Sequence, residues 1–261
     1  MPRVIVTRPA PEAARWVREF QASGIDAVAL PLIEIVPEPM QGALAQARAR
    51  LDEYHAVMFV SGNAVHGFLE QKTPHVRVDK ALTAINTIAW SPGPGTTAAL
   101  RAAGWPAARI DAPAADAPQF DSETLWARVA PQASAGRRVL IVRGGDTQGR
   151  IAGRDWLAAR LAEAGVQVDQ VLAYRRAAPR LGPAQCALAE AAVADGSLWL
   201  FSSSEAIANL RAALPRLDVS RAAVLATHPR IAQAARAAGF GTVRDTRPAL
   251  DDVVASIESF A

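Results

Sequence analysis

Four short polar loops each follow an apolar run of the sequence and come directly before a helical pattern. Where a parallel strand ends and a helix begins, the first backbone N–H groups of the helix point outward and suit an anion. Ser, Thr and Asn at such places also cap helices, so a purely structural capping role stays open for each of them. The loops are Ser61-Gly62-Asn63, Gly93-Pro94-Gly95-Thr96, Ser202-Ser203-Ser204 and Thr227-His228-Pro229.

Two arginines lie at matching ends of predicted strands. Arg8 occurs in Thr7-Arg8-Pro9 after the run 4–6, and Arg143 occurs in Arg143-Gly144-Gly145 after the run 139–142. A guanidinium group can bind a carboxylate or phosphate through two hydrogen bonds, so both are candidates for binding a polyanionic small molecule. Because 26 of the 28 Lys and Arg residues are arginines, an ordinary surface arginine is an equally open interpretation.

Tyr174 is one of only two tyrosines in the chain, and it lies just after the predicted strand 166–172. A phenol at the end of a strand can donate a proton or a hydrogen bond to a bound molecule. The structural alternative is a half-buried aromatic side chain of the core.

Several other kinds of function have no support in the sequence. A single cysteine, Cys186, excludes an internal disulfide framework and a thiolate metal cluster, and the four histidines lack the spacing of a zinc motif. The net charge of +3, without a basic cluster interleaved with aromatics, gives no reason to expect nucleic-acid binding. We find no apolar run near the roughly 20 residues that span a membrane and no signal peptide, and we expect a cytoplasmic protein.

Strands that alternate with helices must position these loops. Ala13, Trp16, Val17 and Phe20 fall on one face of a helix between the apolar runs 4–6 and 28–33, and Gly24 ends that helix. Similar helical patterns separate the later apolar runs. This alternation predicts βαβ units and a parallel sheet, so the fold class is α/β.

The two halves of the chain resemble each other. Residues 59–65 parallel 201–207 at an offset of 142, and residues 16–24 parallel 157–165 at an offset of 141. The turns at Gly93-Pro94 and His228-Pro229 are a third matching pair. The sequence therefore predicts two similar α/β units. Pro37, Pro39 and Pro179 are the best candidates for crossings between them, and ordinary surface turns are the alternative.

Taken in order along the chain, these motifs resemble the uroporphyrinogen-III synthase family. The matching pieces are 4–9, 30–35, 59–65, 93–96, 121–123, 139–144, 171–175, 201–207 and 227–229. The chain departs from the family pattern at Gly62, at Ser91-Pro92, at Arg176 and at His228.

The resemblance implies two flavodoxin-like, doubly wound parallel-sheet domains joined by two extended linkers, with the active site in the cleft between them. The first domain would combine 1–36 with 177–261. The second would be 37–176, including the linker strands.

The resemblance also implies a lyase of porphyrin and heme biosynthesis. Such an enzyme cyclises the linear tetrapyrrole hydroxymethylbilane with loss of water and inversion of the last pyrrole ring, and it needs no metal and no organic cofactor. Tyr174 would be catalytic, and Thr7, Arg8, Arg143, Gly144 and the four polar loops would bind the substrate. We expect a monomer that binds neither nucleic acid nor membrane. The alternative is a non-catalytic two-domain protein that binds a small anion.

Overall fold

The computed structural model describes residues 1–70, 86–114, 117, 119–151 and 156–260. The apolar run 84–89 also predicts a strand, and its first two residues, 84 and 85, lie outside the described part. The chain divides into two compact units: unit 1 is Met1–Glu34 with Ala177–Ala261, and unit 2 is Ile35–Arg176. The division expected from the sequence puts the first boundary at 36/37 and the second at 176/177.

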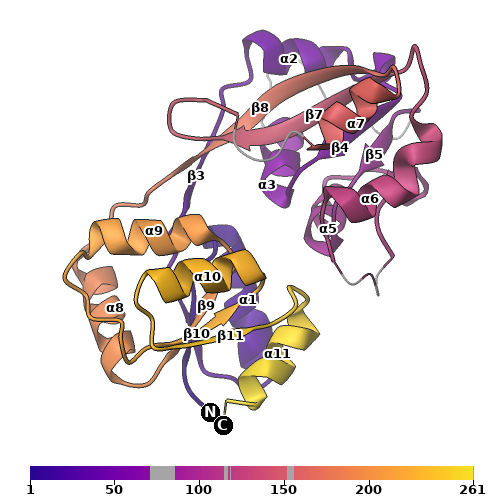
Figure 1. The fold of residues 1–261 in the computed structure, drawn as a ribbon. Helices are drawn as coiled ribbons and strands as arrows, with labels where there is room; N and C mark the ends of the chain where they lie inside the picture. The colour runs from indigo at the N-terminus through magenta and orange to yellow at the C-terminus, as the bar shows by residue number, and fades with distance from the viewer. Residues whose placement is uncertain (71–85, 115–116, 118, 152–155, 261) are drawn as a thin grey trace. The chain divides into compact units, whose positions relative to one another are not determined.

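Within the described residues, unit 1 contains a five-stranded sheet in the order β11-β10-β9-β1-β2, and its neighbouring strands are parallel. The strands are β1 (Val4–Val6), β2 (Ala27–Ala29), β9 (Leu198–Phe201), β10 (Ala223–Ala226) and β11 (Thr242–Asp245). The helices of this unit are α1 (Ala10–Ala22), α8 (Pro183–Ala194), α9 (Ser204–Ala213), α10 (Pro229–Ala237) and α11 (Leu250–Glu258) (Figure 1). The strand order reverses direction between β1 and β9, which is where ligands bind in doubly wound folds.

The described part of unit 2 contains a mixed sheet in the order β3-β8-β7-β4-β5-β6. The strands are β3 (Glu34–Pro37), β4 (Ala56–Phe59), β5 (Ile88–Trp90), β6 (Ile110–Asp111), β7 (Arg138–Gly145) and β8 (Gln167–Ala177). The helices are α2 (Gly42–Ala49), α3 (Gly62–Val65), α5 (Pro94–Ala102), α6 (Ser122–Val129) and α7 (Trp156–Glu163), and α3 continues as a π-helical turn over His66–Glu70 (Figure 1).

The two sheets share one strand order, as the repeat in the sequence predicts. The order β8-β7-β4-β5-β6 corresponds to β2-β1-β9-β10-β11, and α7 corresponds to α1. The registers agree as well, because Val4 pairs with Leu198 where Val139 pairs with Ala56. Counting on from these pairs makes Arg8 and Arg143 equivalent residues, although Arg8 lies beyond the end of β1 and Arg143 lies within β7.

Segments at both unit boundaries meet at one edge of the unit 2 sheet, where β3 lies beside β8. The backbone N–H of Glu38 donates to the Ala173 carbonyl at 3.0 Å, and the Glu38 carboxylate accepts hydrogen bonds from the Arg175 guanidinium. Pro37 is the last residue of β3, and Pro179 follows the end of β8. The predicted linkers are thus largely strand.

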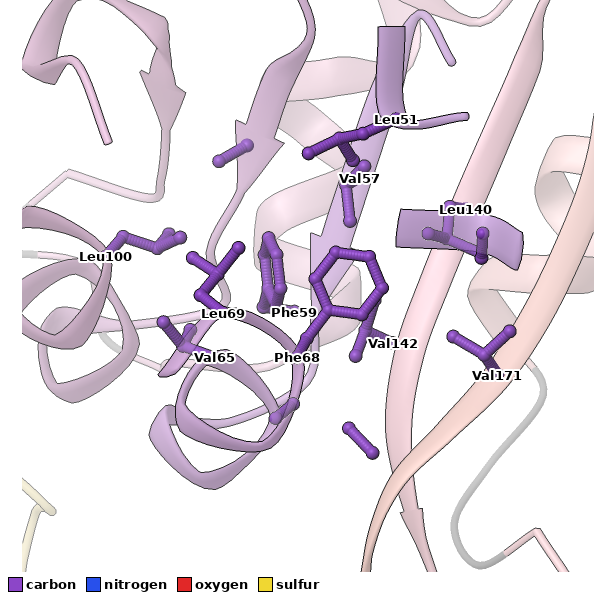
Figure 2. Packing of buried hydrophobic residues seen from close by; sticks show 14 of the residues in the cluster. Leu51, Val57, Phe59, Val65, Phe68, Leu69, Leu100, Leu140, Val142 and Val171 are labelled. Carbon is purple, nitrogen blue, oxygen red and sulfur yellow. The ribbon is translucent and has the colours of Figure 1, made fainter. Parts of the chain in front are cut away.

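The central strands β4 and β7 of the unit 2 sheet are buried on both faces, which explains why they read as continuous apolar runs rather than alternating ones. Val57, Phe59, Leu140 and Val142 belong to the cluster on one face, which α2, α3 and α5 cover. Figure 2 shows Phe59 and Phe68 side by side in this cluster, with ring centroids 5.8 Å apart. The intervening strand residues, such as Met58 and Ile141, pack on the other face against α6 and α7.

A charged network closes the amino end of this sheet. Tyr54, which is 6% exposed, donates to Asp169 at 2.8 Å, and Asp169 also accepts from Arg138 at 2.7 Å. Burial first, and then the Asp169 carboxylate, raise the pKa of Tyr54 from 10.0 to about 12. Because the folded pKa lies above the ordinary value, Tyr54 contributes stability below pH 10 that is lost as the pH rises from 10 to 12.

The raised pKa of Tyr54 gives a direct expectation. In the variant Tyr174→Phe, Tyr54 is the remaining tyrosine, so ultraviolet titration of the folded protein should show one tyrosinate transition with a midpoint near pH 12. In denaturant the midpoint should return to about 10. A folded-state midpoint near 10 would contradict the burial of this hydroxyl.

Candidate functional site

All four predicted loops lie at the carboxyl ends of strands and begin helices. Ser61, Ser203 and His228 are the N-caps of α3, α9 and α10, and their side chains accept a backbone N–H of the helix at 3.2, 3.2 and 3.1 Å. Gly93 is the N-cap of α5. The capping role is therefore confirmed for these three side chains, and anion binding stays a prediction.

Tyr174 combines both interpretations that its sequence position allows. Its ring belongs to the hydrophobic cluster of unit 2, and the residue is 5% exposed. Its hydroxyl oxygen lies 3.0 Å from the Ser61 hydroxyl oxygen, at hydrogen-bonding distance. The hydrophobic core thus holds the ring in place while the hydroxyl reaches the loop after β4.

Gly144 makes this contact possible. Strand β7 lies between β8, which carries Tyr174, and β4, which precedes Ser61, so the side chain must cross β7. It crosses at Gly144, which pairs with Tyr174 after an irregularity in the β7–β8 register. A Cβ atom at Gly144 would lie 2.4 Å from the Tyr174 Cζ atom and 2.8 Å from its hydroxyl oxygen. Only glycine leaves room for the phenol.

The two equivalent arginines are largely buried, so neither is an ordinary surface arginine. Arg143 is 4% exposed and donates to the Gln170 side-chain oxygen at 2.8 Å. The Arg8 side chain is 15% exposed, donates to Glu12 at 3.2 Å and lies 4.2 Å above the Trp16 ring. Burial lowers the pKa of Arg8. Carboxylate binding by either residue stays a prediction.

Two threonines of the predicted site have structural roles beside β9. The Thr7 hydroxyl, in a residue that is 1% exposed, donates to the Leu200 carbonyl at 2.7 Å. The Thr227 backbone N–H donates to the Phe201 carbonyl at 3.1 Å. These bonds fix the strand ends on either side of β9, which the sequence motif did not reveal.

At three positions that depart from the family pattern, the residues present are compatible with these loops. Ser91 is fully buried, donates to the Gly93 carbonyl at 2.9 Å and accepts from Thr97, so it holds the turn before α5. A Cβ at Gly62 would meet the nearest atom, on Ala99, at 3.5 Å, an ordinary contact. His228 serves as a cap through its ring nitrogen.

The remaining predicted residues complete the loops. Pro94 and Pro229 are the first residues of α5 and α10, where a missing N–H costs nothing.

The polar residues of the loops differ in exposure. Ser204 is exposed, and Asn63 is half-buried. The Ser202 hydroxyl is buried and makes no hydrogen bond within the described part of the chain. Gly95 has open space around its Cα, whereas Thr96 is buried.

The close contact between Gly67 and β8, which helps to place Tyr174, was not predicted from the sequence. Gly67, in the π-helical turn, approaches β8 so closely that a Cβ there would lie 2.4 Å from the Ala173 carbonyl oxygen. This close approach packs the turn against the strand position before Tyr174. A glycine inside a helical pattern, between His66 and Phe68, was the available signal.

In the part of the chain that the structure describes, no group of three or more His, Cys, Asp or Glu side chains could hold a metal ion. No helix in that part of the chain has the length and apolar character to cross a membrane.

Comparison with known proteins gives one family and two informative structures. The family model described as "Uroporphyrinogen-III synthase HemD" matches residues 14–255. The uroporphyrinogen-III synthetase of Helicobacter pylori 26695 is 16% identical with a TM-score of 0.59, and the match covers 100% of both chains. A mutant uroporphyrinogen III synthase of Thermus thermophilus is 18% identical with a TM-score of 0.53, covering 100% of this chain and 97% of that one. Both share the fold.

Proposed function

Because the chain belongs to the uroporphyrinogen-III synthase family, we propose that Tyr174 and the strand-end loops carry out that family's reaction. The enzyme is a lyase of heme biosynthesis that cyclises hydroxymethylbilane to uroporphyrinogen III. It removes water and inverts the last pyrrole ring. The observation that carries this function is the family match over residues 14–255. It does not favour a non-catalytic anion-binding protein.

The substrate is a flexible tetrapyrrole with carboxylate side chains, and we propose that backbone N–H groups bind many of these. Helices α5, α9 and α10 each begin at a predicted loop, and each offers the positive end of a helix dipole there. Arg8 and Arg143 would add charge at the two strand-order reversals. The proposed binding residues are Thr7, Arg8, Ser61, Gly62, Asn63, Gly93, Pro94, Gly95, Thr96, Arg143, Gly144, Ser202, Ser203, Ser204, Thr227, His228 and Pro229.

We propose that the Tyr174 hydroxyl protonates the departing hydroxyl group. As the hydroxymethyl C–O bond breaks, its electron pair leaves with the oxygen, and the phenolic proton turns that oxygen into water. The lone pair of the pyrrole nitrogen forms the new double bond of an azafulvene cation, so the substrate supplies most of the driving force. The protein then needs chiefly to hold the chain folded for ring closure. We propose further that the enzyme acts as a monomer in the cytoplasm.

The product isomer tests this function. Hydroxymethylbilane closes without enzyme to the type I isomer, in which all four rings keep their order. Type III requires attack at the substituted position of the last ring through a strained spiro intermediate, which demands a fixed geometry. We expect the purified protein, without added metal or nucleotide, to yield mainly type III on chromatographic separation. Type I alone, at the uncatalysed rate, would contradict the function.

A further inference from the structure

The Ser61 hydroxyl makes two polar contacts at once. Its oxygen accepts the Ala64 backbone N–H at 3.2 Å, which caps α3, and it lies 3.0 Å from the Tyr174 hydroxyl oxygen. An ordinary N-cap needs only the first of these contacts. The second contact joins residues 113 positions apart in the chain and exists because Gly144 lets the phenol pass over β7.

The direction of the Ser61–Tyr174 hydrogen bond decides what the phenol can do. Each hydroxyl has one proton, and either oxygen can be the donor at this distance. If Tyr174 donates to Ser61, its proton is occupied within the protein. If Ser61 donates to Tyr174, the phenolic proton is directed elsewhere and can be transferred, and Ser61 stabilises the phenolate that remains.

We propose that Ser61 is a positioning residue. Its hydroxyl donates a hydrogen bond to the Tyr174 oxygen, while the Ser61 oxygen accepts the capping hydrogen bond from the Ala64 backbone N–H. This inference rests on the proposed function. During C–O cleavage the phenolic proton passes to the leaving oxygen and gives water. The hydrogen bond from the Ser61 hydroxyl to the Tyr174 oxygen shortens as that oxygen becomes a phenolate, and so stabilises its negative charge. The proton that the tetrapyrrole loses at the end of ring closure returns to the phenolate and restores the starting state.

Comparison of the two units shows that this pairing is more than a by-product of capping. Ser203 holds the equivalent cap in unit 1 and accepts a backbone N–H at the same distance of 3.2 Å. Counting on from the shared register, the residue equivalent to Gly144 is Pro9, which lies beyond the end of β1 as the N-cap of α1. Unit 1 therefore has no glycine at this position that would leave room for a side chain from the neighbouring strand. The repeated fold supplies the cap, and unit 2 alone adds the phenol.

The test is a double-mutant cycle measured as kcat and KM with hydroxymethylbilane. Ser61→Ala should lower kcat by about tenfold, as expected for the loss of one hydrogen bond to a developing charge, with a smaller effect on KM. In the Tyr174→Phe background the same change should lower kcat by less than about twofold, because the group it acts through is gone. Ser61→Thr should restore kcat, since threonine keeps both the hydroxyl and the cap, and the extended backbone at Ser61 accepts a β-branched residue.

Ser61→Gly separates capping from positioning, because glycine caps nearly as well as serine but has no hydroxyl. It should lower kcat like Ser61→Ala, and it serves in place of the alanine variant if that one fails to fold. Equal losses in both Tyr174 backgrounds, a change confined to KM, or a slow Thr variant would each overturn the proposal. In those cases the wild-type enzyme would still form type III, whereas wild-type enzyme that forms no type III would refute the proposed function itself.

Discussion

Tyr174→Phe is expected to lower kcat by more than tenfold, or at least about 1.4 kcal/mol in activation free energy. The ring is buried in the hydrophobic cluster of unit 2, so phenylalanine keeps the packing and removes only the hydroxyl. The loss should therefore appear in the chemical step, with little change in KM or in the thermal unfolding of the protein. Steady-state formation of uroporphyrinogen from hydroxymethylbilane measures it.

Tyr54→Phe is the matched control, because it makes the same substitution at the other tyrosine. Tyr54 also donates a hydrogen bond from its hydroxyl, to Asp169, but at the amino end of the sheet. This variant should lose stability and keep kcat. If Tyr174→Phe turned over at the wild-type rate, Tyr174 would be a core aromatic only, and the proton would have to come from another group.

Gly144→Ala is the second change for which we expect a large effect. The added methyl group would lie 2.4 Å from Cζ of Tyr174, well inside van der Waals contact, so the buried ring must move. We expect kcat to fall at least as far as in Tyr174→Phe, and the free energy of unfolding to fall by about 1–3 kcal/mol from overpacking. Urea unfolding and turnover measure the two effects on the same preparation.

Gly182→Ala is the control for exchanging glycine with alanine. Gly182 has a negative φ of −78°, and the nearest atom to its added methyl group, on Gln185, would be 3.8 Å away. This change should leave kcat as it is. A Gly144→Ala enzyme with wild-type turnover would mean that the phenol can reach its working position by another path, which contradicts the route over β7.

The sequence predicted those parts of the site that depend on local rules. Capping residues follow strands because helix N-termini need acceptors, so the loops at Ser61, Ser203 and His228 were predictable. The repeat placed Arg8 and Arg143 at matching positions, and counting on from the shared register agrees, although Arg143 lies within β7 whereas Arg8 follows the end of β1.

Long-range contacts could not be predicted in the same way. The Ser61–Tyr174 bond depends on which strand lies between β8 and β4, and on a register irregularity at Gly144. Likewise, the burial of Arg143 against Gln170 follows from side-chain packing across two strands. No residue spacing within one loop carries that information.

The strand pairing at the unit boundaries bears on how the chain reaches its fold. Unit 1 is interrupted by unit 2, so β1 must find β9 across a long stretch of chain; the Thr7–Leu200 bond spans 193 positions. Unit 2 is continuous and can fold while the ribosome still holds the last third of the chain. Once β3 pairs with β8, the two ends of this insertion lie side by side. Each halving of the length of the open loop lowers the entropic cost of closing it by about 0.6 kcal/mol. Folding of unit 2 first therefore lowers the entropic cost of pairing β1 with β9.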